Sequence, residues 1–318
     1  MSRPRGPRPH TVQPVRLAGR PAALCGTPGA VHAQGATQPD LPADTPWSAP
    51  DPRGHRWLLR PDRPASARLA SLMLAGKDHL AADRMLLDRL QSEDAHCLVR
   101  ARRGREFLHH AAGHLAERGL DQFLDLGCGL TTGAPGTALA PIHTSVLTAR
   151  PGARVVYLDR DPVVMAHARA LLDAPAPAQV RHLRADLATP GALLAKLREH
   201  AGLEWRRPVA AVLGDVLHEL SDPQARCLLA ALRRELPAGS VLVLSHRTAV
   251  AGAPGRAARV AACWEQADLP WYPRTPEAVD ALLDGWERQE LGVESVAGEA
   301  ASGVYAVVAV SSSGGRGR

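Results

Sequence analysis

The feature that most constrains the fold is a regular alternation of short apolar segments and helical segments between residues 122 and 246. The apolar segments have the composition of buried strands: QFLDLGCG (122–129), RVVYLD (154–159), VRHLRAD (180–186), PVAAVLGD (208–215) and SVLVLSH (240–246). Helical patterns follow most of them, at about 162–172, 190–200 and 222–236. Strands that alternate with helices of about 10–15 residues predict a parallel, doubly wound sheet.

The C-terminal part follows a different pattern. Thr275 has the properties of a helix N-cap and Pro276 those of a first helical residue, so a helix is expected to begin there. Two strand-like segments follow, WERQELGVES (286–295) and GVYAVVAV (303–310), and the short connection between them permits an antiparallel hairpin. The predicted fold is α/β, with a Rossmann-like, mostly parallel sheet that ends in this hairpin.

Composition divides the chain into four parts. Residues 1–60 contain 11 Pro and 6 Gly without a helical or strand period, which predicts a disordered, Pro/Arg-rich tail. Residues 61–121 have helical periodicity and are expected to form a helical preface. The Rossmann-like domain is expected over residues 122–311, and residues 312–318 form a second disordered tail.

The basic charge of the chain is concentrated in its N-terminal tail. The net charge is +6, but residues 1–60 carry eight Arg against three Asp, whereas the rest of the chain carries 30 basic and 29 acidic residues. The globular part is therefore nearly neutral. It lacks the basic face of a nucleic-acid-binding domain, so we expect no nucleic-acid partner.

Cysteine usage and hydropathy indicate a cytoplasmic protein. The five cysteines are scattered and none has Cys-x-x-Cys spacing, which predicts neither a disulfide framework nor a zinc site. No apolar run approaches the roughly 18 residues of a membrane span, and Pro and Arg interrupt the N-terminus before a signal-peptide core could form. We therefore expect a soluble protein without a membrane partner. The oligomeric state is left open.

A glycine turn follows the first predicted strand. Gly127 and Gly129 allow the backbone to turn tightly and approach a ligand, and Cys128 between them suits a small buried position better than a nucleophile. Such a turn suits a dinucleotide, S-adenosylmethionine or no ligand. A dinucleotide site requires a third glycine where Thr132 stands, and the carboxylate of Asp125 would repel a pyrophosphate. Asp125 suits the ammonium and sulfonium groups of S-adenosylmethionine.

Further acids follow the second and third predicted strands. Asp159 can accept hydrogen bonds from both ribose hydroxyls, and Asp186 can accept one from the adenine amino group. Their neighbours Arg160 and Leu187 are included in the predicted cofactor site, whereas Asp161 is expected to cap the next helix. Acids at three successive strand ends meet at one edge of a doubly wound sheet, where such sheets bind ligands.

The fourth predicted strand brings Asp215, His218 and Glu219 to the same edge, and Asp215 is included in the cofactor site. His218 is a candidate general base toward an acceptor hydroxyl; the alternative is a helix-start histidine bonded to backbone. The chain contains no Asn and no Asp-Pro-Pro-Tyr segment, so the motif of many amino-group methyltransferases is absent and the acceptor atom is expected to be oxygen or carbon. His109, His110 and His114 include an i, i+4 pair that could bind a metal, but no third ligand is evident nearby, so no metal is predicted.

With these residues in place, the sequence resembles an actinobacterial family of S-adenosylmethionine-dependent methyltransferases first described as a domain of unknown function, DUF574. The resemblance covers about residues 60–310, in the segments LAGKDHLAAD (74–83), REFLHHA (105–111), QFLDLGCGLTT (122–132), RVVYLDRDPVVMAHARALL (154–172) and RPVAAVLGDVLHELSD (207–222). It implies a class I methyltransferase fold, S-adenosylmethionine as cofactor and a ligand-contacting turn at Asp125, Gly127 and Gly129, with Asp159 as the ribose acid.

The preface departs from the family pattern. Its LASLMLAGKD stretch lacks the tyrosines found in the family and has Ala75 where the family has glycine. Lys77 is expected to pair with the cofactor carboxylate or an acidic acceptor, and Asp78 to cap a helix that begins at His79. The first hypothesis is an enzyme that methylates a small molecule of specialised metabolism. A non-catalytic protein that binds the cofactor or its product, and a nicotinamide-dependent oxidoreductase, are the alternatives.

Overall fold

The computed structural model describes residues 60–131, 133, 136–138, 140–171, 179–248, 255–289 and 303–311. The two predicted disordered tails, residues 1–60 and 312–318, lie outside this part of the chain except for Arg60, and they remain predictions. All described residues belong to one compact unit. Within them, no helix combines the length and the apolar character needed to cross a membrane.

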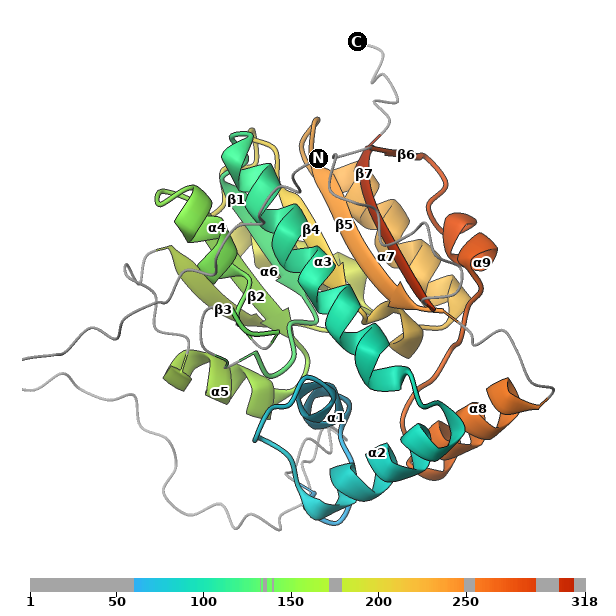
Figure 1. Cartoon of the computed structure of the whole chain (residues 1–318). Helices are drawn as coiled ribbons and strands as arrows, with labels where there is room; N and C mark the ends of the chain where they lie inside the picture. The colour runs from blue at the N-terminus through green and yellow to red at the C-terminus, as the bar shows by residue number, and fades with distance from the viewer. Residues whose placement is uncertain are drawn as a thin grey trace, which may run out of the picture. The chain divides into compact units, whose positions relative to one another are not determined.

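In the described part of the chain, seven strands form one sheet in the order β3-β2-β1-β4-β5-β7-β6 (Figure 1). They are β1 (Gln122–Leu126), β2 (Arg154–Asp159), β3 (Val180–Arg184), β4 (Ala210–Gly214), β5 (Val241–Arg247), β6 (Trp286–Arg288) and β7 (Val304–Ser311). β1 to β5 pair in parallel, and β7 runs antiparallel to both β5 and β6. The predicted sheet and its antiparallel C-terminal pair are confirmed. β1 lies between β2 and β4, where the winding reverses and doubly wound sheets bind ligands.

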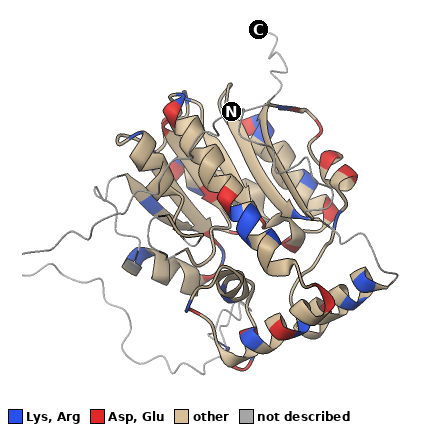
Figure 2. Cartoon of the chain, viewed as in Figure 1, with Lys and Arg blue, Asp and Glu red and all other residues tan. Residues whose placement is uncertain are grey.

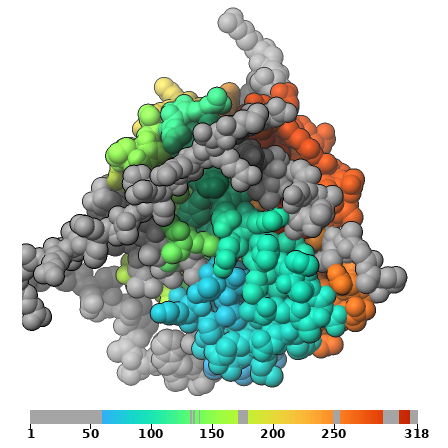
Figure 3. Space-filling view, in the orientation of Figure 1, coloured from blue at the N-terminus to red at the C-terminus, as the bar shows by residue number. Residues whose placement is uncertain are grey.

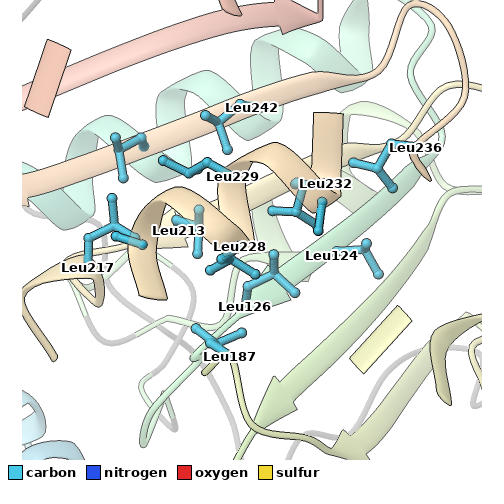
Figure 4. Close-up of a cluster of buried hydrophobic side chains, with 14 of the residues drawn as sticks. Leu124, Leu126, Leu187, Leu213, Leu217, Leu228, Leu229, Leu232, Leu236 and Leu242 are labelled. Carbon is cyan, nitrogen blue, oxygen red and sulfur yellow. The ribbon is translucent and has the colours of Figure 1, made fainter. Parts of the chain in front are cut away.

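Helices cover both faces of the sheet. One face packs against α3 (Cys97–Glu117), α4 (His143–Ala149) and α5 (Pro162–Leu171), and the other against α6 (Pro190–His200), α7 (Asp222–Glu235) and α9 (Pro276–Asp280). Side chains alternate along a strand, so β5 sends Val241 and Val243 to the first face and Leu242 and Leu244 to the second. Leucines fill much of the second core (Figure 4).

A third group of helices lies at the carboxyl ends of the parallel strands. α1 (Ser66–Met73), α2 (Ala81–Glu93) and α8 (Arg256–Gln266) gather there with the start of α3 (Figure 1). Leu69, Leu86 and Trp264 belong to an apolar cluster that these helices share. We call α1, α2 and α8 the cover helices. The helical residues of the preface thus serve two purposes, since α3 supports the sheet while α1 and α2 belong to the cover.

Helices α2, α4 and α9 differ from the sequence prediction. α4 was not anticipated, because its sequence HTSVLTA is rich in β-branched residues with low helix propensity; it is anchored by the fully buried Val146. α9 is capped by Thr275 as expected, but it ends at Asp280. The expectation that Asp78 caps a helix from His79 is wrong: α2 begins at Ala81, and its capping carboxylate, Asp83, lies inside its first turn.

Candidate functional site

The carboxyl ends of the parallel strands face a cavity of about 450 Å³. Its walls come from the turn after β1, the ends of β2 to β5, α1, part of α3 and residues 268–270. α1 lies across the cavity from the strand ends, and α1 to α3 form a continuous surface in Figure 3. Eight of the predicted site residues line the cavity: Gly127, Cys128, Gly129, Asp159, Arg160, Asp186, Leu187 and Asp215.

The glycine turn is shaped by its neighbours. Gly127 has a φ of +77°, and a Cβ there would lie 2.6 Å from a methyl carbon of Val216, so both conformation and space require glycine. Gly129 has a φ of +60°, but a Cβ there would meet nothing within 4 Å. The backbone beside Gly129 is therefore open to a ligand. Burial raises the pKa of Cys128 well above its usual value, so its thiol is neutral and unsuited to nucleophilic attack.

Asp159 connects the end of β2 to this turn. Its Oδ2 accepts a hydrogen bond from Gly129 N at 3.0 Å, and its Oδ1 accepts one from Asp161 N at 2.9 Å. Burial raises the pKa of Asp159 to about 6, although these two hydrogen bonds act in the opposite direction. Asp161 caps α5 as predicted, since its Oδ1 accepts from Val163 N at 2.8 Å. Asp159 is thus held rigidly at the cavity wall.

The end of β3 provides Asp186 and Leu187 on the same side. Asp186 Oδ1 accepts a hydrogen bond from Ala188 N at 2.9 Å, which fixes the carboxylate at the cavity. Leu187 is buried and approaches Gly127 from the side. Arg160 pairs with Glu219 at 2.9 Å, linking the ends of β2 and β4 across the cavity. Acids and an apolar side chain therefore meet where the sequence predicts the adenosine end of a cofactor.

Asp125 lies behind the cavity wall rather than in it. Its side chain is 1% exposed, and neither carboxylate oxygen has a hydrogen-bond partner among the described residues. The nearest cation is Arg105 of α3, whose Nη1 is 3.9 Å from Asp125 Oδ2. Burial raises the pKa of Asp125 to about 6, and the charge of Arg105 limits the rise. A direct contact between Asp125 and a cofactor ammonium stays a prediction.

We expect Asp125→Asn to stabilise the ligand-free protein at pH 8. Because the folded-state pKa of about 6 exceeds the roughly 3.9 of an unfolded Asp, wild-type stability is lost as pH rises from about 4 through 6. Two pKa units correspond to about 3 kcal/mol, which an uncharged amide avoids. Urea denaturation at pH 8 and pH 4 measures the difference, which should disappear at pH 4. A variant less stable than wild type at pH 8 contradicts this account.

Asp215 follows β4 in a conformation that favours glycine, with a φ of +52°. Its Oδ2 lies 2.5 Å from Arg247 Nε, and its Oδ1 lies 3.6 Å from His218 Nδ1. Burial alone would raise the pKa of Asp215, but the charge of Arg247 and the nearby His218 outweigh it and hold the pKa well below its usual range. Backbone strain of this kind persists where a site requires it. The result is a carboxylate that stays ionised at the cavity.

His218 lies behind Asp215 and does not line the cavity. Its side chain is 3% exposed, and its ring centroid is 5.7 Å from that of Trp264 and 4.9 Å from that of Trp271. It is the second residue of the short helix η1 (Leu217–Glu219), and its Nδ1 lies near Asp215 without a hydrogen-bond partner among the described residues. The role of general base stays a prediction that this position does not favour.

Lys77 is exposed and lies outside the cavity lining. The turn after α1 directs it away, with Gly76 N donating to Ser71 O at 2.8 Å and Ala75 at a φ of +65°. That conformation explains why the family has glycine at position 75. The structure thus brings eight predicted site residues together and leaves Lys77 apart from them.

The buried polar residues that line the cavity and were not predicted as site residues include Ser71, Arg105, Ser245 and Arg247. All four are buried, and neither serine hydroxyl has a hydrogen-bond partner among the described residues. Helical periodicity could have identified two of them, because Arg105 and Ser71 fall at positions that face the apolar side of their helices. A polar side chain at such a buried position is a candidate for ligand contact.

The strand order, with the cavity at the carboxyl edge, is that of the class I methyltransferase architecture. The sequence model of the family described as S-adenosyl methyltransferase matches residues 54–300, so the chain belongs to this family. S-adenosylmethionine is accordingly its methyl donor. The cavity fits this molecule, because the open backbone at Gly129 and the acids Asp159 and Asp186 line one side of it.

Two solved structures extend the comparison. A DUF574 family protein from Streptomyces avermitilis is 29% identical, with a TM-score of 0.68 over 79% of this chain and 99% of that one. A candidate methyltransferase from Thermobifida fusca is 28% identical, with a TM-score of 0.68 over 81% of this chain and 98% of that one. No protein with a curated description matches the chain. The family resemblance inferred from the sequence is confirmed.

Proposed function

We propose that this methyltransferase acts on a small-molecule acceptor, at oxygen or carbon, in specialised metabolism. The observation that carries this proposal is the position of the cavity beneath α1. A covered cavity admits a small molecule, whereas a nucleic-acid acceptor requires an open basic face. Basic and acidic residues both occur along the helices visible in Figure 2, and the group of arginines on α3 includes the buried Arg100 and Arg105.

The lining suggests how the cofactor lies. Asp159 is assigned to the ribose hydroxyls, Asp186 and Leu187 to the adenine, and the backbone of Gly127 and Gly129 to the middle of the molecule. This orientation follows the sheet order, in which β3 and β2 lie on one side of β1. The amino-acid end and the transferred methyl group then lie toward β1 and β4, near Asp215.

The acceptor is assigned to the part of the cavity between α1 and β5. Apolar side chains surround it, including Met73, Leu108 and Leu269, and the unpartnered hydroxyls of Ser71 and Ser245 lie among them. A buried hydroxyl without a partner costs about 1–3 kcal/mol, which a ligand with matching polar atoms removes. An uncharged molecule with an apolar body and a few hydroxyl or carbonyl groups meets these requirements.

When bound, S-adenosylmethionine supplies an electrophilic methyl group. The described residues contribute mainly by orienting two ligands and excluding water. Arg247 keeps Asp215 ionised, which makes it a weak base, and His218 lies outside the cavity lining. An acceptor that is readily deprotonated, or a carbon nucleophile, suits such a site better than an alcohol that needs a strong base.

A cytoplasmic location accompanies this proposal. Among the described residues the cysteines Cys97, Cys128, Cys227 and Cys263 are free thiols. Thiols persist in reducing compartments, where the enzymes of small-molecule metabolism have access to S-adenosylmethionine.

The proposal is tested by supplying the protein with S-adenosylmethionine that carries a deuterated methyl group. The acceptor mixture contains hydroxylated aromatic and heterocyclic small molecules, together with transfer RNA and a protein extract. Mass spectrometry is expected to find the labelled methyl group in the small-molecule fraction. Label in the RNA or protein fraction contradicts the proposal. Tight binding of S-adenosylhomocysteine without transfer to any fraction supports the alternative of a non-catalytic binding protein.

A further inference from the structure

A buried arginine lies at the end of the cavity where the amino-acid part of the cofactor is assigned. Arg105 lies on α3, on the same helical face as Ala101 and Leu108, and all three line the cavity. Its side chain is 8% exposed. A Cβ on Gly214, at the end of β4, would lie 3.9 Å from Arg105 Nη1, so the guanidinium stands beside the switch point of the sheet. A cation is thus held inside the site.

Part of the guanidinium has no hydrogen-bond acceptor among the described residues. Nη2 donates a hydrogen bond to Ala140 O at 3.1 Å, whereas Nε has no partner among the described residues. The distance of 3.9 Å between Nη1 and Asp125 Oδ2 is too long for a hydrogen bond, so Asp125 balances the charge without occupying the donors. Buried donors without acceptors are costly, and a guanidinium fork matches a carboxylate in shape and charge.

The hydrogen bond from Arg105 to Ala140 O, in the loop after the glycine turn, is not enough to explain why an arginine is buried here. Ala140 O also receives a hydrogen bond from His109 Nε2 at 2.9 Å, and His109 Nδ1 accepts one from Ser145 Oγ at 2.8 Å. Burial, followed by the charge of Arg105, lowers the pKa of His109 to about 4, so its ring is neutral and has one donor and one acceptor as this arrangement requires. The loop therefore has a second anchor.

The other cavity arginines face acids or carbonyl groups. Arg247 Nε lies 2.5 Å from Asp215, Arg160 pairs with Glu219, Arg63 with Asp268 and Arg60 with Asp62. Arg68 pairs with Asp83 and donates to Arg63 O. Among the described cations that line the cavity near β1 and β4, Arg105 therefore has the donors best placed for an anionic group.

We infer that Arg105 binds the α-carboxylate of the cofactor, with Asp125 as the nearest buried acid. This inference rests on the orientation assigned under the proposed function, with the adenosine at β2 and β3. It transfers to Arg105 the role that the sequence suggests for Lys77. Asp215 then lies on the same side as the α-ammonium. The α-carboxylate would therefore face the cation Arg105, and the α-ammonium would face the anion Asp215.

Two ligands that differ only in the carboxylate test the inference. Calorimetric titration compares S-adenosylhomocysteine with its decarboxylated analogue, 5′-deoxy-5′-(3-aminopropylthio)adenosine, in wild type, Arg105→Met and Arg102→Met. Wild type should prefer S-adenosylhomocysteine by at least about tenfold, as loss of a charge-assisted pair predicts. Arg105→Met should bind both ligands about equally. Arg102 is exposed on the same helix, so Arg102→Met should retain the wild-type preference.

A wild type that binds both ligands equally overturns the inference even if Arg105→Met fails to fold. An Arg105→Met protein that keeps the preference overturns it as well. A wild type that binds neither ligand contradicts the assigned cofactor site on which the inference rests, so the two failures are distinguishable. Arg105→Lys, which keeps the charge but loses the fork, should restore part of the preference.

Discussion

Replacing Asp159 by Ala is expected to lower the affinity for S-adenosylhomocysteine about a hundredfold. Two hydrogen bonds from ribose hydroxyls to a charged acceptor are worth on the order of 3 kcal/mol, and a factor of ten corresponds to about 1.4 kcal/mol. Asp159 is suited to this role because backbone N–H groups of Gly129 and Asp161 hold its two oxygens at the cavity wall. Calorimetric titration measures the change.

The control for this prediction is Asp161→Ala. Asp161 also lines the cavity and carries the same charge, but its Oδ1 caps α5. Loss of the cap should lower the free energy of unfolding by about 1 kcal/mol and leave the affinity within about fivefold. Circular dichroism verifies that both variants fold. An Asp159→Ala protein that folds and binds S-adenosylhomocysteine as tightly as Asp161→Ala contradicts the ribose assignment.

The sequence was sufficient for the sheet and for the strand-end acids. Parallel strands bring their carboxyl ends to one edge whatever their side chains, so a correct strand pattern places Asp159, Asp186 and Asp215 together. Helix caps were also predictable, because a cap involves residues only two or three positions apart, as at Asp161 and Thr275. These features depend on spacing along the chain, which a sequence displays directly.

Features that depend on packing between distant elements were not predictable. Arg105 comes close to Asp125 because α3 packs against β4 and β5 beside β1, and no pattern within either segment predicts that packing. His218 falls outside the cavity because Trp264 and Trp271 surround it. Periodicity also fails to anticipate α4, whose residues favour strands and become helical through burial.

One buried carboxylate, the last residue of the LAGKDHLAAD segment, links two of the cover helices, α1 and α2. Asp83 has no exposed surface and accepts three hydrogen bonds, from Ala65 N at 2.9 Å, Arg68 Nε at 2.7 Å and Leu80 N at 2.7 Å. It therefore caps α2 and fixes the start of α1 at the same time. Because α1 forms one wall of the cavity, the shape of the site depends on this carboxylate.

Asp83→Asn is accordingly expected to lower the free energy of unfolding by about 3–5 kcal/mol, as removal of one partner from a buried ion pair does. The amide keeps the volume of the side chain but turns one acceptor into a donor, and the buried guanidinium of Arg68 loses its counter-charge.

Asp88→Asn is the matched control, because Asp88 is exposed on the same helix and should change stability by no more than about 0.5 kcal/mol. Urea denaturation compares the two variants, and hydrogen exchange over residues 66–73 reports whether α1 opens before the sheet unfolds. Because an opened α1 removes a cavity wall, the affinity for S-adenosylhomocysteine should fall in Asp83→Asn alone. Equal stability and equal protection of α1 in the two variants would show that Asp83 does not hold the cover in place.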